Sequence, residues 1–433
     1  MRHLLLFFLL ISLFSLTAMP QTPEQLAADW DRSHISHIFP SDVRHTDLKK
    51  YLDELKKIGI KVDEVGESFG GREIYQIEWG RGPLKVFMWS QMHGDEPTAT
   101  SALVDMFAFL QNNRNLDWVR KIERAVTIRA VPMLNPDGSE LFQRRSIQGI
   151  DINRDALNLA TPEARLLKRL RADWQPAIGF NLHNQNSLTS VGRTPKQATI
   201  SFLVVYGDPA KTSNPGHERS MRLASAMTQA LKKFIPGHMA RYADEWSPTA
   251  FGDNFSAWGT PAILIETGGH YGKDEMFLIK LNFVAYLTAF NALTSGSEAT
   301  QDPNVYRTLP ENSSGILVDF VFRNATLAPR SGGATVDIAA VTQRRRASFP
   351  KPVVILSVGY IGGRRGLEEY DASSFFVVQR FSSVKAEELA EFAFYKRSRT
   401  IDWSAADLET RFSPDAIFSF GRWIKGAGVV PRK

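Results

Sequence analysis

Short apolar runs of strand length alternate with helix-like segments through residues 45–295 of this 433-residue chain. Parallel strands need long crossover connections, so strands that alternate with helices predict an α/β sheet covered by helices on both faces. Reactive side chains in such folds are expected just beyond the carboxyl ends of the strands. The runs that carry the argument are residues 86–89, 126–131, 177–182 and 261–265.

The chain is long enough for two domains. Residues 294–304 are rich in Ser, Gly, Thr, Asp and Pro, a composition typical of a linker. Strand-like runs dominate the remainder, and helices are predicted at residues 386–394 and 405–411. We therefore predict a β-rich accessory domain with a role in substrate presentation or stability. The predicted division is residues 1–21 signal peptide, 22–295 larger α/β domain, 296–304 linker and 305–433 accessory domain.

The first 21 residues have the composition of a secretory signal peptide. Arg2 and His3 precede an apolar run over residues 4–14, and small or polar residues follow it. That run is too short to span a bilayer, and no other segment is read as apolar enough to do so. We therefore predict an exported protein, periplasmic or extracellular, with no stable membrane insertion.

Charge and cysteine content exclude several further classes. The net charge of +6 is spread thinly over the chain, and there is no cysteine, which excludes disulfide bonds. The compact basic runs are Arg344-Arg345-Arg346 and Arg364-Arg365. No aromatic-rich basic groove accompanies them, so the sequence predicts solvated loops and no nucleic-acid partner. The oligomeric state is left open.

His93 and Glu96 stand three residues apart, soon after the strand-like run at residues 86–89. Pro97 suits the first position of the helix that is expected to follow. Imidazole nitrogens and carboxylate oxygens are zinc ligands, and a catalytic zinc typically keeps three protein ligands and a water. Taken alone, a His-x-x-Glu pair is more often part of a solvated loop than of a metal site.

His183 and Glu266 stand at the ends of two other predicted strands. A third metal ligand and a carboxylate that deprotonates a bound water are what a zinc hydrolase still needs. His183 and Glu266 are the candidates for these two roles. The alternatives are a core or capping histidine and a helix-capping or salt-bridged glutamate.

Three more polar residues are candidates for binding the substrate. Arg144 is available to stabilise an oxyanion. Asn153 and Arg154 are the pair expected to bind a substrate carboxylate, because a guanidinium offers a bidentate fork. An ordinary surface ion pair is the alternative for each arginine.

Together these motifs resemble the zinc carboxypeptidases of the carboxypeptidase A type, peptidase family M14. The resemblance covers about residues 45–295 and implies a mixed central sheet flanked by helices, with one zinc ion (Zn2+) per chain. It rests on the order and spacing of His93-x-x-Glu96, the Asn-Pro-Asp-Gly turn at residues 135–138, Arg144, Gly149-x-Asp151-x-Asn153-Arg154, His183 and Glu266.

The resemblance also implies a role for each candidate. His93, Glu96 and His183 would bind the zinc. Glu266 would act as general base on the zinc-bound water and then pass the proton to the leaving amine, while Arg144 polarises the scissile carbonyl. The implied activity is that of a secreted metallocarboxypeptidase that hydrolyses C-terminal peptide bonds. The residues that would hold the terminal carboxylate are Asn153 and Arg154.

Two rival functions stay open at this point. An exported protein with the same zinc site can be an amidase that acts on cell-wall muropeptides. The fold can also serve as a catalytically silent peptide- or glycan-binding module, although the presence of three ligands and Glu266 argues against that. Near the expected side-chain pocket, Asp253 either selects basic side chains or is a turn residue or a residue that supports the site from behind, and the latter reading is favoured.

Overall fold

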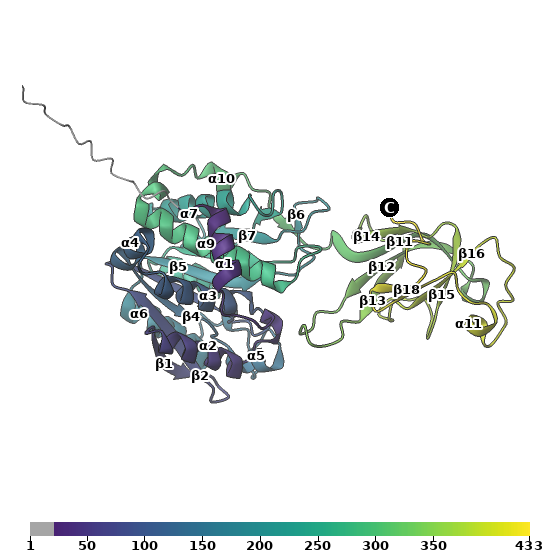
Figure 1. The fold of residues 1–433 in the computed structure, drawn as a ribbon, viewed down its shortest axis with the longest axis horizontal. Coiled ribbons are helices and arrows are strands. Elements are labelled where there is room, and N and C mark those ends of the chain that lie inside the picture. The colour runs from purple at the N-terminus through teal and green to yellow at the C-terminus, as the bar shows by residue number, and fades with distance from the viewer. Residues whose placement is uncertain (1–20) are drawn as a thin grey trace, which may run out of the picture.

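A computed structural model describes residues 21–433 of the chain as two neighbouring bodies, each built on its own sheet (Figure 1). The predicted signal peptide lies outside the described residues, apart from residue 21. The larger body carries the helices and the smaller one is almost entirely β.

The larger body contains an eight-stranded sheet in the order β1-β2-β4-β3-β5-β9-β7-β8. The central strands β4, β3, β5 and β9 are parallel, and the pairings β1–β2, β2–β4 and β7–β9 are antiparallel. The predicted mixed sheet is therefore confirmed. The strands are β1 (Lys61–Glu67), β2 (Glu73–Gly80), β3 (Leu84–Ser90), β4 (Val126–Val131), β5 (Ile178–Asn184), β7 (Ile200–Val204), β8 (Met239–Arg241) and β9 (Ala262–Thr267).

Helices cover both faces of this sheet, because successive side chains of each central strand point to opposite faces. Val86 and Met88 of β3 join one core, and Phe87 and Trp89 join the other. The first core is closed by α1 (Pro23–Ser33), α2 (His45–Lys57), α3 (Thr98–Asn112), α4 (Asp117–Ala125), α7 (Pro215–Leu231) and α9 (Glu275–Ser295). The second is closed by α6 (Pro162–Trp174) and α8 (Phe251–Ala257).

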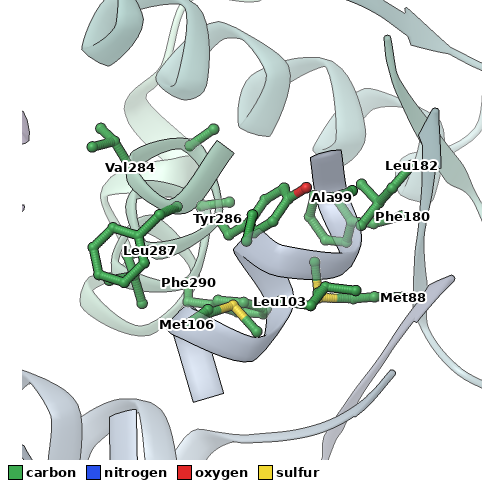
Figure 2. Close-up of a cluster of buried hydrophobic side chains, with 14 of the residues drawn as sticks. Met88, Ala99, Leu103, Met106, Phe180, Leu182, Val284, Tyr286, Leu287 and Phe290 are labelled. Carbon is green, nitrogen blue, oxygen red and sulfur yellow. The ribbon is translucent and has the colours of Figure 1, made fainter. Parts of the chain in front are cut away.

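The helix α9 corrects one prediction. Its 21 residues are long and apolar enough to cross a membrane by length and composition, contrary to the reading that no segment after the leader is. In the structure 67% of the 18-residue apolar window within this helix is buried inside the protein. Figure 2 shows α3 lying between α9 and the sheet, so the apolar surface of α9 is used in the core. The side chains labelled there include Leu103 and Met106 of α3, Tyr286 and Phe290 of α9, and Met88 and Phe180 of the sheet.

The smaller body is a second sheet in the order β13-β12-β11-β15-β16-β17-β18, with β14 paired to β11. The β-rich C-terminal region is thereby confirmed, but the predicted helix at residues 386–394 is wrong. Phe392 and Phe394 pair with β15 and lie in an aromatic core, so tertiary packing overrides the local helix preference. The elements are β11 (Leu317–Leu327), β12 (Thr335–Thr342), β13 (Val353–Gly359), β14 (Arg365–Asp371), β15 (Phe375–Gln379), β16 (Phe392–Lys396), α11 (Leu408–Arg411), β17 (Ala416–Ser419) and β18 (Arg422–Lys425).

The segment between the two sheets lies along the larger body. It contains η3 (Ser297–Thr300), α10 (Asn304–Arg307) and β10 (Asn312–Ser313), and β10 pairs with β6 (Ser190–Val191). The Val204 amide also donates a 3.0 Å hydrogen bond to the Tyr306 hydroxyl. The connection is thus attached to the larger body up to residue 313, while the division into domains stays a prediction.

The loop between β12 and β13 reaches back to the larger body near α5 (Pro136–Leu141) (Figure 1). Arg346 on this loop is 6% exposed. Its guanidinium donates hydrogen bonds to the backbone carbonyls of Ser41 (2.9 Å), Glu140 (3.0 Å) and Ser139. The prediction that the basic run 344–346 is an ordinary solvated loop is therefore wrong, because the third arginine is buried at an inter-domain contact.

Candidate metal centre and active-site cleft

The loop that carries His93 is fixed by a buried glutamine. Gln91 follows β3 with a positive φ of 47°, an uncommon conformation for a residue other than glycine. Its amide group donates to the Gly94 carbonyl and to the Ser139 hydroxyl, both at 2.9 Å, and its carbonyl accepts from the Thr100 hydroxyl at 2.7 Å. These bonds hold the loop against α5 and α3. No sequence pattern singles out Gln91 for this role.

Gly94 allows the same loop to approach α5 closely. A Cβ atom at this position would overlap the backbone of Gly138 and Ser139. The approach is possible because α5 begins in the Asn-Pro-Asp-Gly segment, where the Asn135 side chain caps the helix by accepting from the Gly138 amide at 2.8 Å. The segment predicted as a turn is thus the first turn of a short helix, and this helix supports the loop that carries His93.

His93, Glu96 and His183 come together in one buried cluster. The Nδ1 atoms of His93 and His183 lie 2.9 Å and 2.7 Å from the two carboxylate oxygens of Glu96, and 3.2 Å from each other. Four donors about 2.0–2.1 Å from a tetrahedral zinc lie roughly 3.3 Å apart, so this spacing fits a zinc ion. Within residues 21–433, these three side chains form a group whose donor atoms lie close enough together to hold one metal ion. The three predicted ligands therefore have the donor chemistry and the convergence that a zinc site requires.

Asp151 orients the first of these predicted ligands, His93. One carboxylate oxygen accepts from His93 Nε2 at 3.0 Å and from the Asn153 amide at 3.0 Å, and the other accepts from Arg144 Nε at 3.0 Å. A carboxylate on the far nitrogen of a ligand histidine fixes its ring and raises its basicity. In the sequence Asp151 stands out only as one member of a motif, without a role of its own.

Opposing effects set the pKa of His93. Burial acts to lower it, and the negative charge of Glu96 together with the hydrogen bond to Asp151 outweighs burial and raises the pKa to about 9. The same contacts, together with Arg144, hold the pKa of Asp151 far below its usual range although its own burial opposes this. The metal-free cluster therefore holds a proton on His93 at neutral pH.

Glu266 stands beside His183 because the two residues are register partners in the parallel pair β5–β9. Paired residues of neighbouring strands project from the same face of a sheet. Glu266 is 8% exposed, and its Oε2 atom has no hydrogen-bond partner among the described residues. Burial, and then the charge of Glu96, raise its pKa to about 8. An unsatisfied, basic carboxylate thus faces the cleft next to the ligand cluster.

Arg144 also reaches the cluster. Its Nη1 atom donates to Glu96 Oε1 at 3.2 Å, while its Nε atom donates to Asp151 at 3.0 Å. The side chain is 44% exposed, so part of the guanidinium faces the cleft. A cation held at this point is placed to interact with an oxygen that gains negative charge near the ligands.

Asn153 and Arg154 lie on η2 (Ile152–Arg154) at the wall of the same cleft. The side-chain oxygen of Asn153 accepts a hydrogen bond from the backbone amide of Phe251 at 3.0 Å. This bond orients the side-chain NH2 group of Asn153 as the remaining donor. The Arg154 guanidinium donates to the Asn153 backbone carbonyl at 2.9 Å and is exposed. The next residue, Asp155, binds the amides of Ala160 and Thr161 and therefore supports the fold.

The cleft encloses about 830 Å³ and brings all seven predicted site residues to one surface. Tyr242 and Asp253 also line it. Asp253 lies in the first turn of α8 and accepts a 2.9 Å hydrogen bond from the Ser247 amide, so it stabilises the segment before that helix. Burial raises its pKa to about 6. One further lining residue is Arg344, which belongs to the accessory body and was predicted to be a solvated loop residue.

Comparison with known proteins agrees with this geometry. Residues 48–237 match the family model described as zinc carboxypeptidase. This part of the chain is therefore similar to the zinc carboxypeptidase family. The resemblance found in the sequence is thereby confirmed, although the matched segment is less than half of the chain.

Curated relatives of the zinc carboxypeptidase domain are similar over short segments. Carboxypeptidase 2 of Trichophyton rubrum is 33% identical over 131 residues, which are 30% of this chain and 24% of the relative. Carboxypeptidase SOL1 of Arabidopsis thaliana is 26% identical over 157 residues, 32% of each chain. The chain thus spans about a quarter to a third of the length of these relatives.

Solved structures give matches at lower identity. The metallo-carboxypeptidase from Burkholderia cenocepacia has a TM-score of 0.49 at 17% identity, covering 58% of this chain and 69% of that one. The Pseudomonas aeruginosa metallo-carboxypeptidase, solved with (2-guanidinoethylmercapto)succinic acid, has a TM-score of 0.47 at 17% identity, with the same coverages.

Proposed function

We propose that this chain is an exported zinc metallocarboxypeptidase that removes residues from the carboxyl terminus of peptides. One observation carries the proposal: the His93–Glu96–His183 cluster and the unsatisfied carboxylate of Glu266 lie side by side in a single cleft. A silent binding module would have no use for this combination. The family match at residues 48–237 supports the same activity.

Zinc would be held by His93, Glu96 and His183, and when bound it would supply Lewis-acid chemistry, lowering the pKa of a water and polarising a carbonyl. The cluster fits the ion, since its donor atoms are two imidazole nitrogens and a carboxylate at tetrahedral spacing. Asp151 would keep the His93 ring in place during turnover.

The remaining steps belong to protein side chains. Glu266 would be ionised beside a dication, because a neighbouring opposite charge lowers a carboxyl pKa. It would then accept a proton from the attacking water and donate it to the nitrogen of the leaving residue. Arg144 would donate a hydrogen bond to the oxygen of the scissile carbonyl as that oxygen gains charge.

Asn153 and Arg154 would determine which bond is cut. The Asn153 NH2 group and the Arg154 guanidinium both offer donors to the cleft, and a guanidinium binds a carboxylate in a bidentate manner. Binding the free carboxylate there would place the last peptide bond at the ligand cluster. This arrangement restricts hydrolysis to the chain end.

The test is a Glu266→Gln variant assayed on a library of peptides with free carboxyl termini, read by mass spectrometry with and without a chelator. The wild type should contain about one zinc per chain and lose all trimming with the chelator. The variant should keep its zinc and lose about 10²–10⁴-fold in turnover, because it cannot accept the proton. Glu245→Gln, which removes the same charge within the cleft, is the matched control.

Two results would contradict the proposal. Full activity in Glu266→Gln would remove that residue from the role of general base. Turnover of muropeptides alone, with every linear peptide untouched, would favour the amidase over the carboxypeptidase.

A further inference from the structure

The accessory body places an arginine next to the ligand cluster. Arg344 lies on the loop between β12 and β13, and its Nη1 atom donates to the Asp95 carboxylate at 3.1 Å. Its Nη2 atom donates to the Asp95 backbone carbonyl. Asp95 lies between the ligands His93 and Glu96 in the sequence. A residue 249 positions away thus contacts the loop that carries two of the three ligands.

Buried contacts hold this loop in place. Arg346 donates to three backbone carbonyls of the larger body, as described above. The Ala347 amide donates to the Ser41 hydroxyl at 2.9 Å, and the Ser348 hydroxyl donates to Asp42 at 2.7 Å. Because its neighbours are anchored, Arg344 is presented at a defined place on the cleft wall.

A second hollow of about 780 Å³ lies between the two bodies and opens from the cleft. The cleft and this inter-domain groove share lining residues from both bodies, and Asn153 and Arg154 line the cleft only. The groove therefore leaves the cleft at the end away from the predicted carboxylate-binding pair. The shared residues include Asp95, Asn184, Gln185, Ser314 and Arg344.

A peptide held by its carboxyl terminus extends away from the residues that bind that terminus. Its last residue occupies the position near Asn153 and Arg154, so the rest of the chain must leave the cleft elsewhere. The inter-domain groove adjoins the cleft through their shared lining residues and therefore offers an exit. At its mouth stands Arg344, whose side chain is 48% exposed and has N–H groups to spare beyond the two that bind Asp95.

We propose that Arg344 is a substrate-binding residue supplied by the accessory domain. It donates hydrogen bonds to backbone carbonyls of the peptide segment on the amino-terminal side of the scissile bond, and the inter-domain groove holds that segment. The inference rests on the proposed carboxypeptidase function. It gives the accessory domain a role in selecting peptides that are long enough to reach the groove.

The experiment compares an N-acylated dipeptide with an N-acylated hexapeptide that ends in the same two residues. The wild type should show a higher kcat/KM for the hexapeptide. Arg344→Ala should lower kcat/KM for the hexapeptide by about tenfold, a loss typical of a hydrogen bond to a charged group, and change the dipeptide by less than about twofold. Arg344→Lys should fall between the two. Arg365→Ala, which removes a cation of the accessory domain that lines neither hollow, is the control.

A binding measurement separates this inference from the proposed function. A hexapeptide whose last peptide bond is reduced to CH2–NH cannot be hydrolysed, and its affinity is measurable by calorimetry whether or not the protein is active. Equal affinity for wild type and Arg344→Ala would overturn the inference. An equal loss of kcat/KM on both substrates would also overturn it, because Arg344 would then act through Asp95 on the ligand loop. A wild type that binds the analogue about tenfold better than Arg344→Ala but hydrolyses neither peptide would overturn only the proposed function.

Discussion

The two sheets of this molecule differ in the side chains that they bury. In the larger body, four titratable groups at the carboxyl ends of parallel strands are buried together, namely His93, Glu96, His183 and Glu266. In the smaller body, the sheet encloses aromatic rings, and its contribution to the cleft is made by a loop. The aromatic core includes Phe322, Phe392, Phe394, Phe418 and Trp423.

Strand direction explains the difference. Parallel strands end at one shared edge, so polar residues far apart in the sequence meet there. Most neighbours in the smaller sheet are antiparallel, and their ends alternate between two edges. Such a sheet lacks a common edge for a reactive cluster, and it reaches a site most directly through a connecting loop such as residues 343–352. The proposed chemistry therefore belongs to the larger body, and the proposed contact with an extended peptide belongs to the smaller one.

The largest effect is expected from removing a predicted zinc ligand at the carboxyl end of one of the parallel strands. His183→Ala leaves two zinc donors, which is too few for a stable catalytic site, so zinc content and hydrolysis should both be lost, the latter by more than about 10³-fold. Zinc per chain by mass spectrometry and peptide trimming are the measurements. Arg344→Ala, on the loop of the other body, should keep its full zinc content.

A variant His183→Ala with one zinc per chain would break the comparison. The third ligand would then lie elsewhere, and the convergence seen at the strand ends would have another purpose.

A second test concerns the protons bound by His93 and Glu266, which lie at the carboxyl ends of the parallel strands. In the metal-free protein the pKa of His93 is about 9 and that of Glu266 is about 8, so both groups carry a proton at pH 7. Zinc must displace the proton on His93 and favours loss of the one on Glu266. Zinc affinity should therefore rise with pH up to about 9, by about tenfold per pH unit for each proton displaced.

Calorimetry in two buffers of different ionisation enthalpy counts these protons. About two should be released per zinc at pH 7, and about one in Glu266→Gln, since the amide has no proton to lose. An affinity that does not change between pH 6 and pH 9 would contradict the protonation assigned to His93.

The smallest expected effect concerns the contact between the two bodies. Arg346→Ala removes a buried guanidinium and leaves the carbonyls of Ser41, Ser139 and Glu140 without their donor. Leaving buried polar groups unsatisfied costs about 1–3 kcal/mol, so the free energy of unfolding should fall by that amount. Hydrogen exchange should increase at residues 41–42 and 347–348, and zinc content should not change.

Arg345→Ala is the matched control for that experiment. Arg345 is exposed and bonds to Gln343 of its own loop, so its loss should change the unfolding free energy by less than about 0.5 kcal/mol. Equal effects of the two substitutions would mean that the buried contact of Arg346 does not hold the loop.

The sequence predicted the larger body well because its signals are local. Apolar runs such as residues 86–89 and 261–265 identify buried strands, and the residues that follow them meet at the sheet edge by topology alone. His93, His183 and Glu266 could therefore be selected from the order of residues alone. The role of Asp151 could not be, since a carboxylate that orients a ligand differs from a turn residue only in its tertiary contact.

The accessory body was harder to predict for the same reason. Residues 386–394 have local helix preference, yet the aromatic core around Phe392 and Phe394 requires a strand. The basic run at residues 344–346 looks like solvent-exposed charge, and only the docking of two bodies reveals that Arg346 is buried and that Arg344 faces the cleft. The apolar length of α9 was underestimated from the sequence. Its apolar side chains pack in the core of the larger body.

The close approach of Gly94 to Gly138 has a consequence for recombination between related sequences. The ligand loop and the first turn of α5 touch backbone to backbone, so neither can be exchanged alone without risking a steric clash with the other. Chimeras that keep residues 91–97 and 135–139 from one parent should fold and bind metal more often than chimeras that split them. The two segments behave as one inherited block, although 37 residues of sequence separate them.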